Sequence, residues 1–384
     1  MDRTSALLFS LLRAAVLGEG RTPELPAEEI AAAFALARKH DLGHLVAEAL
    51  RRGDALPQGD LGRAMADERL RAVYRTSRLS HAADGVFALL DAAGIRYIPL
   101  KGALIREVYP APWMRTSCDL DLLLHEEDLD RAIAAIEAGL GSVKRSRRTY
   151  HDISLYLDEE VHIELHFSLL ENRPRMDRVL LRAWDYASPV AEGACRYRPT
   201  NEFLLFHHLA HTAYHLTHGG CGVRPFLDLW LLDARLDCDE TLLDSLLAEA
   251  GLLDFAVAAR RLADAWFGAA LHTDLTQRMA DYILDGGVYG HLDNRVAVSL
   301  SKKSRGRFVL SRLFPPYRVL REYYPALRRH TLLYPFFAVR RWCEVIFTRR
   351  RRRNAVRELR RGASLPKETV APIAALCRDL GLDS

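Results

Sequence analysis

Cys118-Asp-Leu-Asp-Leu-Leu-Leu124 has the alternation of polar and apolar residues that is typical of a β-strand with one buried face. Side chains on a strand point alternately to its two faces, so Asp119 and Asp121 share one side and the leucines share the other. Two carboxylates this close repel each other unless a cation joins them. The stretch therefore predicts a core strand that presents a pair of metal-binding anions.

A second alternating strand, Val161-His-Ile-Glu-Leu-His-Phe167, carries Glu164 and His166 on its polar face. Together with His151–Leu157 and the acidic turn 158–160 it predicts a β-hairpin. If this strand lies beside the first, Glu164 joins the two aspartates around one cation. Oxygen ligands suit Mg²⁺ or Mn²⁺, so we expect Asp119, Asp121 and Glu164 to be both metal ligands and catalytic residues.

A strand-to-helix turn precedes these carboxylates in the sequence. Ile95–Leu100 is a predicted short strand, and Lys101-Gly102 then opens a predicted helix that runs through Tyr109. Backbone N–H groups and the positive end of a helix dipole favour phosphate at such a turn. We expect Lys101, Gly102 and Arg115 to bind the phosphates of a nucleotide, the two cations through charge-assisted hydrogen bonds.

Three regions follow from the change in periodicity along the 384 residues. Residues 1–93 are predicted to be helical, with the clearest helices at Glu28–Lys39 and Leu61–Asp91. Residues 94–195 alternate strands and helices, and residues 196–384 return to helix and end in a basic tail. The expected fold is α+β: a small mixed β-sheet core flanked by helical N-terminal and C-terminal regions.

Composition excludes several classes of protein. The 54 basic and 50 acidic side chains leave a formal charge of only +4, so the chain as a whole is no polycation. Six irregularly spaced cysteines do not form the dense framework of a small disulfide-stabilised domain. The N-terminal apolar residues recur at helical spacing and are interrupted by Arg13, which favours a surface helix over a signal peptide. We expect a cytoplasmic protein.

Three motifs together resemble a known family. They are Leu100-Lys-Gly-Ala103, Arg115-Thr-Ser-Cys-Asp-Leu-Asp-Leu-Leu-Leu124 and His162-Ile-Glu-Leu-His166. In this combination the chain resembles a nucleotidyltransferase family of the polymerase-beta-like nucleotidyltransferase superfamily. The resemblance implies that residues 94–195 form the nucleotidyltransferase core, that Asp119, Asp121 and Glu164 form the acidic triad, and that Gly102 lies against the triphosphate. Many members have Gly-Ser at the turn, whereas here alanine follows Gly102.

A row of histidines marks the helix that is predicted after Asn201. His207, His211, His215 and His218 recur every three or four residues and share one helix face. A zinc site is one interpretation. The other is a core helix whose histidine edge, with His207 and His211, lines the cleft. On the next predicted helix, Arg224 and Asp228 are four residues apart and are expected to pair with each other, or to line the cleft as well.

The segment 331–347 is rich in aromatic and apolar residues, and five consecutive arginines follow it at Arg349–Arg353. Such a segment can bind an anionic membrane or a nucleic-acid backbone through Arg349–Arg361. The alternative is a solvated helix end. Arg340, Arg341 and Glu344 interrupt the apolar run, which is too short to cross a bilayer.

The predicted reaction is the metal-dependent transfer of a nucleoside monophosphate from a triphosphate such as ATP, with release of pyrophosphate. The acceptor stays open between a small molecule, a glycan, a protein and an RNA. The alternative is a catalytically inactive module of the same fold that binds a nucleotide or associates with a membrane or a nucleic acid.

Overall fold

A mixed five-stranded sheet in the middle of the chain carries the predicted site residues. The computed structural model describes residues 2–18, 25–141, 143–146, 148–149, 151–157, 161–171, 173–288, 290–302, 304–324 and 326–383. The sheet has the strand order β1-β2-β5-β4-β3. Its strands are β1 (Tyr97–Pro99), β2 (Asp119–Leu124), β3 (Lys144–Arg145), β4 (Asp152–Tyr156) and β5 (His162–His166). The predicted strand at 118–124 and the predicted hairpin are confirmed, and the acidic turn 158–160 lies outside the described residues.

The pairing of β2 with β5 is parallel, whereas the other pairings in this sheet are antiparallel. Asp119 lies opposite His162, and Asp121 lies opposite Glu164. Residues opposite each other on neighbouring strands point to the same face of a sheet. The register therefore gathers the acidic and histidine side chains of both strands on one face.

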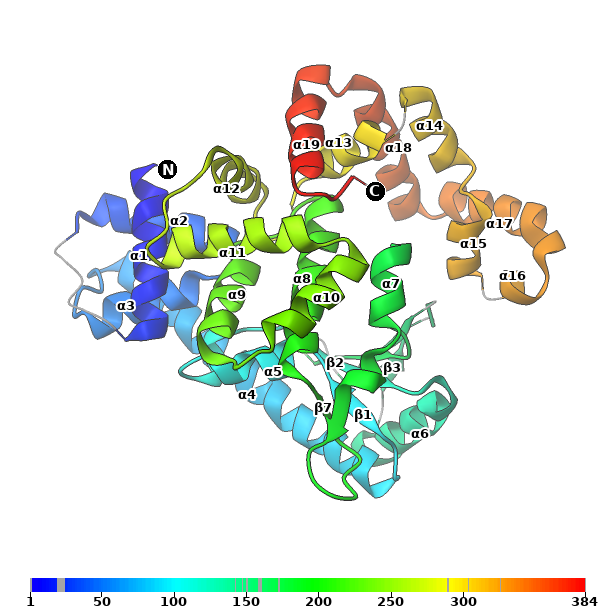
Figure 1. The fold of residues 1–384 in the computed structure, drawn as a ribbon, viewed down its shortest axis with the longest axis horizontal. Helices are drawn as coiled ribbons and strands as arrows, with labels where there is room; N and C mark the ends of the chain where they lie inside the picture. Colours follow the sequence, from blue (N-terminus) through cyan, green and yellow to red (C-terminus); the bar gives the residue numbers. More distant parts are fainter. Residues whose placement is uncertain are drawn as a thin grey trace.

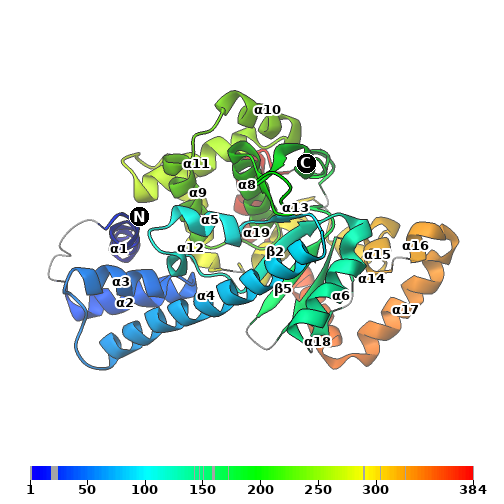
Figure 2. The same ribbon diagram turned by 90° about the horizontal axis from the view of Figure 1, so that it is seen from below.

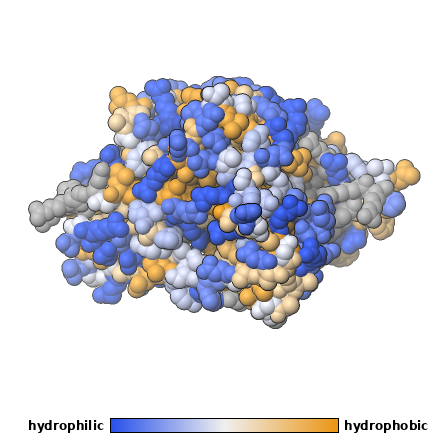
Figure 3. Space-filling model, turned by 60° about the horizontal axis from the view of Figure 1, so that its bottom comes forward, coloured by the Kyte–Doolittle hydropathy of each residue, from blue (hydrophilic) through white to orange (hydrophobic). Residues whose placement is uncertain are grey.

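The apolar side chains of β2 and β5 pack against two helices on the opposite face. Leu120, Leu122 and Leu165 lie in a core shared with α4 (Asp60–Ala92) and α6 (Leu129–Leu140). Figure 1 places α4 and α6 on this side of the sheet, and α8 (Asn201–Thr217) and α10 (Glu240–Ala250) on the other. Seen from the side of α4, the surface is mainly hydrophilic with scattered apolar patches, as expected for the outer face of amphipathic helices (Figure 3).

Helices precede and follow the sheet, which confirms the predicted α+β class. The N-terminal helices are α1 (Arg3–Leu17), α2 (Ala27–Lys39), α3 (Gly43–Arg52) and α4. The short elements between strands are α5 (Gly102–Ile105), η1 (Arg106–Val108), η2 (Pro112–Met114) and η3 (Glu126–Asp128). After β5 come α7 (Pro174–Leu180), η4 (Ala183–Tyr186), α8, α9 (Arg224–Arg235), α10, α11 (Leu253–Phe267) and α12 (Asp274–Gly286). The remaining helices are α13 (Leu292–Lys302), α14 (Arg305–Leu313), α15 (Tyr317–Tyr323), α16 (Ala326–Arg329), η5 (Thr331–Leu333), α17 (Tyr334–Phe347), α18 (Arg349–Ser364) and α19 (Lys367–Asp379).

A small second sheet was not predicted from the sequence. Its antiparallel strands are β6 (Ala187–Pro189) and β7 (Tyr197–Pro199). The amide of Tyr97 donates a hydrogen bond to the carbonyl of Cys195 at 3.0 Å. This bond attaches the second sheet beside β1.

The main hydrophobic core joins residues that are far apart in the sequence. It contains Leu8 and Leu45 from the N-terminal helices, Phe206 from α8, Phe255 from α11 and Leu382 near the C-terminus. Lys39 adds a polar link, because its ammonium donates to the carbonyls of Leu284 at 2.9 Å and Asp285 at 2.7 Å. The N-terminal helices thus pack directly on the helices that follow the sheet. Within the described part of the chain, no helix has both the length and the apolar character needed to cross a membrane.

Candidate metal and nucleotide site

Asp119, Asp121 and Glu164 lie together on the polar face of β2 and β5. Ligand atoms of Asp119, His162 and Glu164 all lie within 4.8 Å of one another, and the same holds for Asp121, Glu164 and His166. Glu164 belongs to both groups, so the parallel pairing of the strands brings the three predicted carboxylates into one cluster. Two histidines of β5 complete it.

The histidines hold the carboxylates in place. His166 Nε2 lies 3.1 Å from Asp121 Oδ1 and 3.4 Å from Glu164 Oε2. His162 Nε2 lies 3.5 Å from Glu164 Oε1, and the ring of Tyr156 stacks on His162 with 4.5 Å between centroids. Burial works against a charged His166, but the hydrogen bonds with the two carboxylates raise its pKa to about 9. His166 therefore carries a positive charge at neutral pH, which offsets part of the negative charge of the cluster.

The two aspartates of β2 titrate in opposite directions. Burial, together with the charges of Asp121 and Glu164, raises the pKa of Asp119 to about 6. Burial also works to raise the pKa of Asp121, but the Lys101 ammonium and the hydrogen bond from His166 lower it below its usual range. Asp119 thus bears the repulsion within the cluster, since it lacks the hydrogen bond that Asp121 accepts from His166.

Lys101 lies at the strained turn between β1 and α5. Its backbone has a φ of 33°, in the left-handed region that a lysine seldom adopts. Its ammonium lowers the pKa of both Asp119 and Asp121, yet no hydrogen bond or ion pair ties it to any residue that the structure describes. The ammonium thus faces the carboxylate cluster and is available to a phosphate.

Gly102, the first residue of α5, provides close packing at the same turn. A Cβ atom at this position would lie 3.1 Å from Arg115 Nη1 and 3.2 Å from Ser117 Oγ. Glycine is needed here because a methyl group would displace side chains that have partners of their own. Ser117, for example, accepts a hydrogen bond from Arg106 at 2.8 Å.

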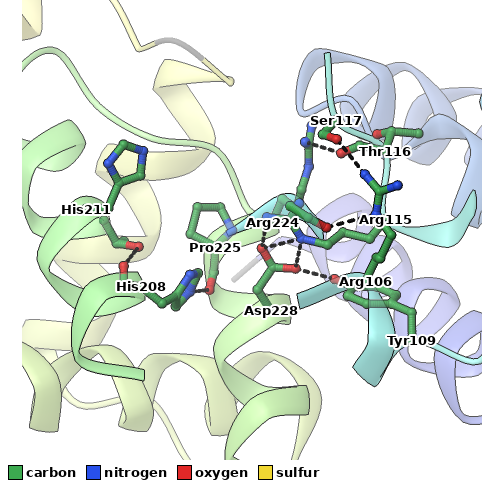
Figure 4. Close-up of polar contacts among 12 residues, drawn as sticks. Arg106, Tyr109, Arg115, Thr116, Ser117, His208, His211, Arg224, Pro225 and Asp228 are labelled. Atoms are coloured by element: carbon green, nitrogen blue, oxygen red, sulfur yellow. Dashed lines mark hydrogen bonds and ion pairs between the residues drawn. The ribbon is translucent and has the colours of Figure 1, made fainter. Parts of the chain in front are cut away.

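Arg115 has a buried partner that was not predicted. Arg115 Nε and Nη2 donate to the carboxylate of Asp228 on α9, with distances of 3.0 Å to Oδ1 and 3.0 Å to Oδ2. Tyr109 donates to the same carboxylate at 2.8 Å. Figure 4 shows Asp228 facing both donors. The ion pair fixes the segment that leads into β2 against the helices on the polar side of the sheet.

The expected pairing of Arg224 with Asp228 is wrong. Arg224 donates instead to Asp41 at 2.5 Å. It also donates to the carbonyl of Thr116 at 2.9 Å (Figure 4). Asp228 is buried with Arg115, so its charge is already neutralised. Neither residue is free to pair along the helix, and both connect α9 to the segment 115–117.

The histidine row of α8 lies near the cluster, since the charges of Lys101, Asp121 and His166 act on His207. His207 is buried, and together with Lys101 and Leu100 it lines a small cavity. His211 Nδ1 lies 2.9 Å from Glu171 Oε1, and His211 Nε2 lies 2.8 Å from His215 Nε2. Burial lowers the pKa of His207 to about 3, so this ring is neutral. Among the described residues the row forms no metal-binding group with other side chains, whereas the β2–β5 cluster forms two.

Glu171 was missed in the sequence because it follows the hairpin in an irregular segment. Burial raises its pKa to about 7, and the charges of Lys101 and His166 act on it in the opposite sense. Asp152 and Ser154 were missed as well, although the alternation of β4 places them on the polar face, opposite His166 and Glu164. The polar side chains around the cluster thus extend beyond the three carboxylates.

The residues present fit a divalent cation. Burial and two neighbouring carboxylates raise the pKa of Asp119. A cation bound between the carboxylates would remove their mutual repulsion. Carboxylate oxygens suit Mg²⁺ and Mn²⁺, and the flanking imidazoles also suit transition metals. Asp119, Asp121 and Glu164 would hold the ion. A cation there, together with Lys101, would give the site the positive charge that a triphosphate requires.

Comparison with known proteins agrees with this site. A family model described as an uncharacterised nucleotidyltransferase matches residues 26–268. No curated protein and no solved structure matches the chain significantly. The matched span covers well over half of the chain and contains the whole β2–β5 cluster, Lys101, Gly102 and the Arg115–Asp228 pair. The chain therefore belongs to this uncharacterised nucleotidyltransferase family.

Proposed function

We propose that the protein transfers a nucleoside monophosphate from a nucleoside triphosphate to an acceptor in a reaction that depends on Mg²⁺ or Mn²⁺. The observation that carries this proposal is the register of β2 and β5, which sets Asp121 opposite Glu164 and gathers three carboxylates on one face of the sheet. Family membership supports a transferase acting on a nucleotide. The acceptor is a small molecule, a glycan, a protein or an RNA.

In the proposed reaction an acceptor oxygen attacks the α-phosphorus of the triphosphate. A new oxygen–phosphorus bond forms, the bond from the α-phosphorus to the bridging oxygen breaks, and pyrophosphate leaves with that electron pair. Glu164 accepts the proton of the acceptor, and Lys101 neutralises phosphate oxygens. Arg115 and Gly102 shape the turn that supports Lys101. When bound, a divalent cation supplies the charge neutralisation that phosphoryl-type transfers need.

The proposal is tested with triphosphates labelled at the α-phosphorus, Mg²⁺ or Mn²⁺, and acceptor pools of each class. We expect label transfer and pyrophosphate release by the wild type, and a loss of at least about a hundredfold in Asp119→Asn and Asp121→Asn. Asp130→Asn is the matched control, because Asp130 is exposed on α6, away from the cluster. Equal labelling by the wild type and the two cluster variants would refute the catalytic assignment.

Binding measurements separate the second candidate, an inactive nucleotide-binding module. Titration calorimetry of a triphosphate with and without the cation reports binding apart from turnover. Metal-dependent binding without transfer to any acceptor class would favour the inactive module. Lys101→Met is expected to weaken triphosphate binding in either case, because the ammonium that faces the cluster is lost.

A further inference from the structure

The solvent-exposed face of α17 is apolar. The exposed residues of this helix recur three or four positions apart and therefore share one face. They are Pro335, Phe336, Val339, Arg340, Cys343, Ile346 and Phe347. Phe336 is 61% exposed, Val339 62% and Phe347 84%. A surface helix normally presents polar side chains to water, so the exposure of this apolar face to water is unfavourable.

The opposite face of α17 is anchored in the protein. Phe337 is buried in a small core with Leu320, Tyr324 and Leu327. Apolar side chains on the outer face are therefore presented by a docked helix and not by a free end. Large exposed apolar patches mark surfaces that bind proteins or membranes.

The next helix, α18, is strongly cationic. Its sequence holds eight arginines and one glutamate, and that glutamate, Glu358, is paired with Arg312 at 2.7 Å. Several arginines line an open depression of about 790 Å³ between α18 and the start of α13. They are Arg349, Arg352, Arg353, Arg357, Arg360 and Arg361. Arg361 is engaged with Asp293, whereas Arg352, Arg353, Arg357 and Arg360 are exposed.

We propose that α17 and α18 seat the protein on an anionic lipid bilayer, with α17 lying in the plane of the interface. The apolar face ends at Phe347 and the arginines begin at Arg349, with only Thr348 between them, and Figure 2 shows α17 leading into α18. A bilayer with anionic headgroups is the partner that satisfies both features at once. An apolar face buried at the headgroup boundary and neighbouring cations are the two signals that stable peripheral binding needs.

The other occupants fit less well. A nucleic acid would pair its phosphates with the arginines but would leave the aliphatic Val339 and Ile346 without a suitable contact. A second copy of the chain could cover the apolar face, but it would bring two arginine-rich helices together and add like-charge repulsion. The membrane proposal concerns α17 and α18 alone and does not depend on the proposed transferase activity.

Sedimentation with lipid vesicles tests the proposal on the full-length protein. The probes are vesicles of phosphatidylcholine alone and vesicles that also contain phosphatidylserine. We expect the wild type to bind the mixed vesicles, and to bind the neutral ones much more weakly. Arg352→Gln/Arg353→Gln should lower affinity for the mixed vesicles by about 25-fold, since each surface cation contributes about fivefold. Phe336→Ser/Phe347→Ser should lower it by roughly tenfold or more through lost apolar burial.

Matched controls lie far from these helices. Leu271→Ser removes another apolar side chain that is 84% exposed, and Arg63→Glu alters an exposed arginine of α4. Both controls should bind as the wild type does. Circular dichroism will confirm that the α17 and α18 variants remain folded, which is expected because the substituted side chains are exposed.

Four results would overturn the proposal. The wild type could fail to sediment with anionic vesicles; the double variants could bind as tightly as the controls; or single-stranded RNA could bind by fluorescence anisotropy while vesicles do not. A dimer that sedimentation velocity detects without lipid, and that Phe336→Ser/Phe347→Ser dissociates, would assign the face to self-association instead.

Discussion

Asp119 carries the electrostatic cost of the site, because burial and two neighbouring carboxylates raise its pKa from 3.8 to about 6. Below pH 3.8 Asp119 is protonated in both the folded and the unfolded chain, so it does not lower the free energy of unfolding. As pH rises towards 6, Asp119 ionises in the unfolded chain before it ionises in the folded protein, so the free energy of unfolding falls. Above pH 6 the loss of unfolding free energy stays constant.

Asp119→Asn should therefore stabilise the metal-free protein increasingly as pH rises. From about pH 4.5 to about pH 8 the advantage of the variant over the wild type should grow by roughly 1 to 2 kcal/mol. Urea denaturation in the presence of a chelator measures it, with Asp130→Asn as the control for which no such trend is expected. A constant difference across this range would show that the cluster does not repel as described.

Asp228 illustrates what a buried charge does when its partner is removed. Replacing either Arg115 or Asp228 alone, by methionine or leucine respectively, should destabilise the protein by about 3 to 5 kcal/mol because the other charge stays buried. The double variant should lose much less than the sum. Urea denaturation of the four proteins completes the cycle.

The surface pair Arg182–Glu249 is the comparison for that cycle, with each side chain 39% exposed. Glu249→Gln should cost less than about 1 kcal/mol. If Arg115→Met cost no more than this, the buried pair would not hold α9 against the segment before β2.

Residue spacing in the sequence predicted which residues form the site. It did not predict which distant residues pair with them. Asp119, Asp121 and Glu164 follow from strand alternation, which is a local property. The partner of Asp228 is 113 residues away, and local spacing offered only Arg224. Tertiary contacts therefore overrode a pairing that a helix on its own would favour.

At the scale of elements, the turn between β1 and α5 holds the site together through close packing. Gly102→Ala would place a methyl group 3.1 Å from Arg115 Nη1, and Arg115 is held by Asp228. We expect a loss of roughly 1 to 2 kcal/mol in stability from this overpacking, together with weaker triphosphate binding.

Gly85→Ala is the matched control for that turn. Its Cβ would lie 3.5 Å from Leu140 Cδ2, an ordinary contact, in the interior of α4. It should stabilise the protein by about 0.5 to 1 kcal/mol, since alanine favours helix. A Gly102→Ala variant that gained stability as Gly85→Ala does would exclude crowding at the turn.

Elements with strong periodicity were predicted closely. The helix expected at Leu61–Asp91 is α4 at Asp60–Ala92, and the hairpin strands differ from the prediction by one residue at each end. The strand expected at Ile95–Leu100 is shorter, and the β6–β7 pair was missed. Three-residue strands contain too little alternation to be recognised.

At the scale of the molecule, the hydrophobic cores differ greatly in size. The main core extends from α1 to α12 and includes Leu376, Leu380 and Leu382 at the C-terminal end. Between them, α13 to α18 rest on two small cores, each with four buried residues among those that the structure describes. The chain thus leaves the main core after α12 and returns to it in α19. This division was not predicted from the sequence, because the helical pattern of the region before α12 continues through α13 to α18.

Hydrogen exchange should reveal this difference directly. Local opening costs less free energy where few apolar contacts are lost, so amides of α15 to α17 should exchange at least roughly a hundredfold faster than those of α8 and α9. The second half of α19 provides an internal control, because it follows the small cores in sequence but packs in the main core. Its amides should be protected like those of α8. If protection instead declined steadily towards the C-terminus, α19 included, position along the chain and not core size would set the local stability.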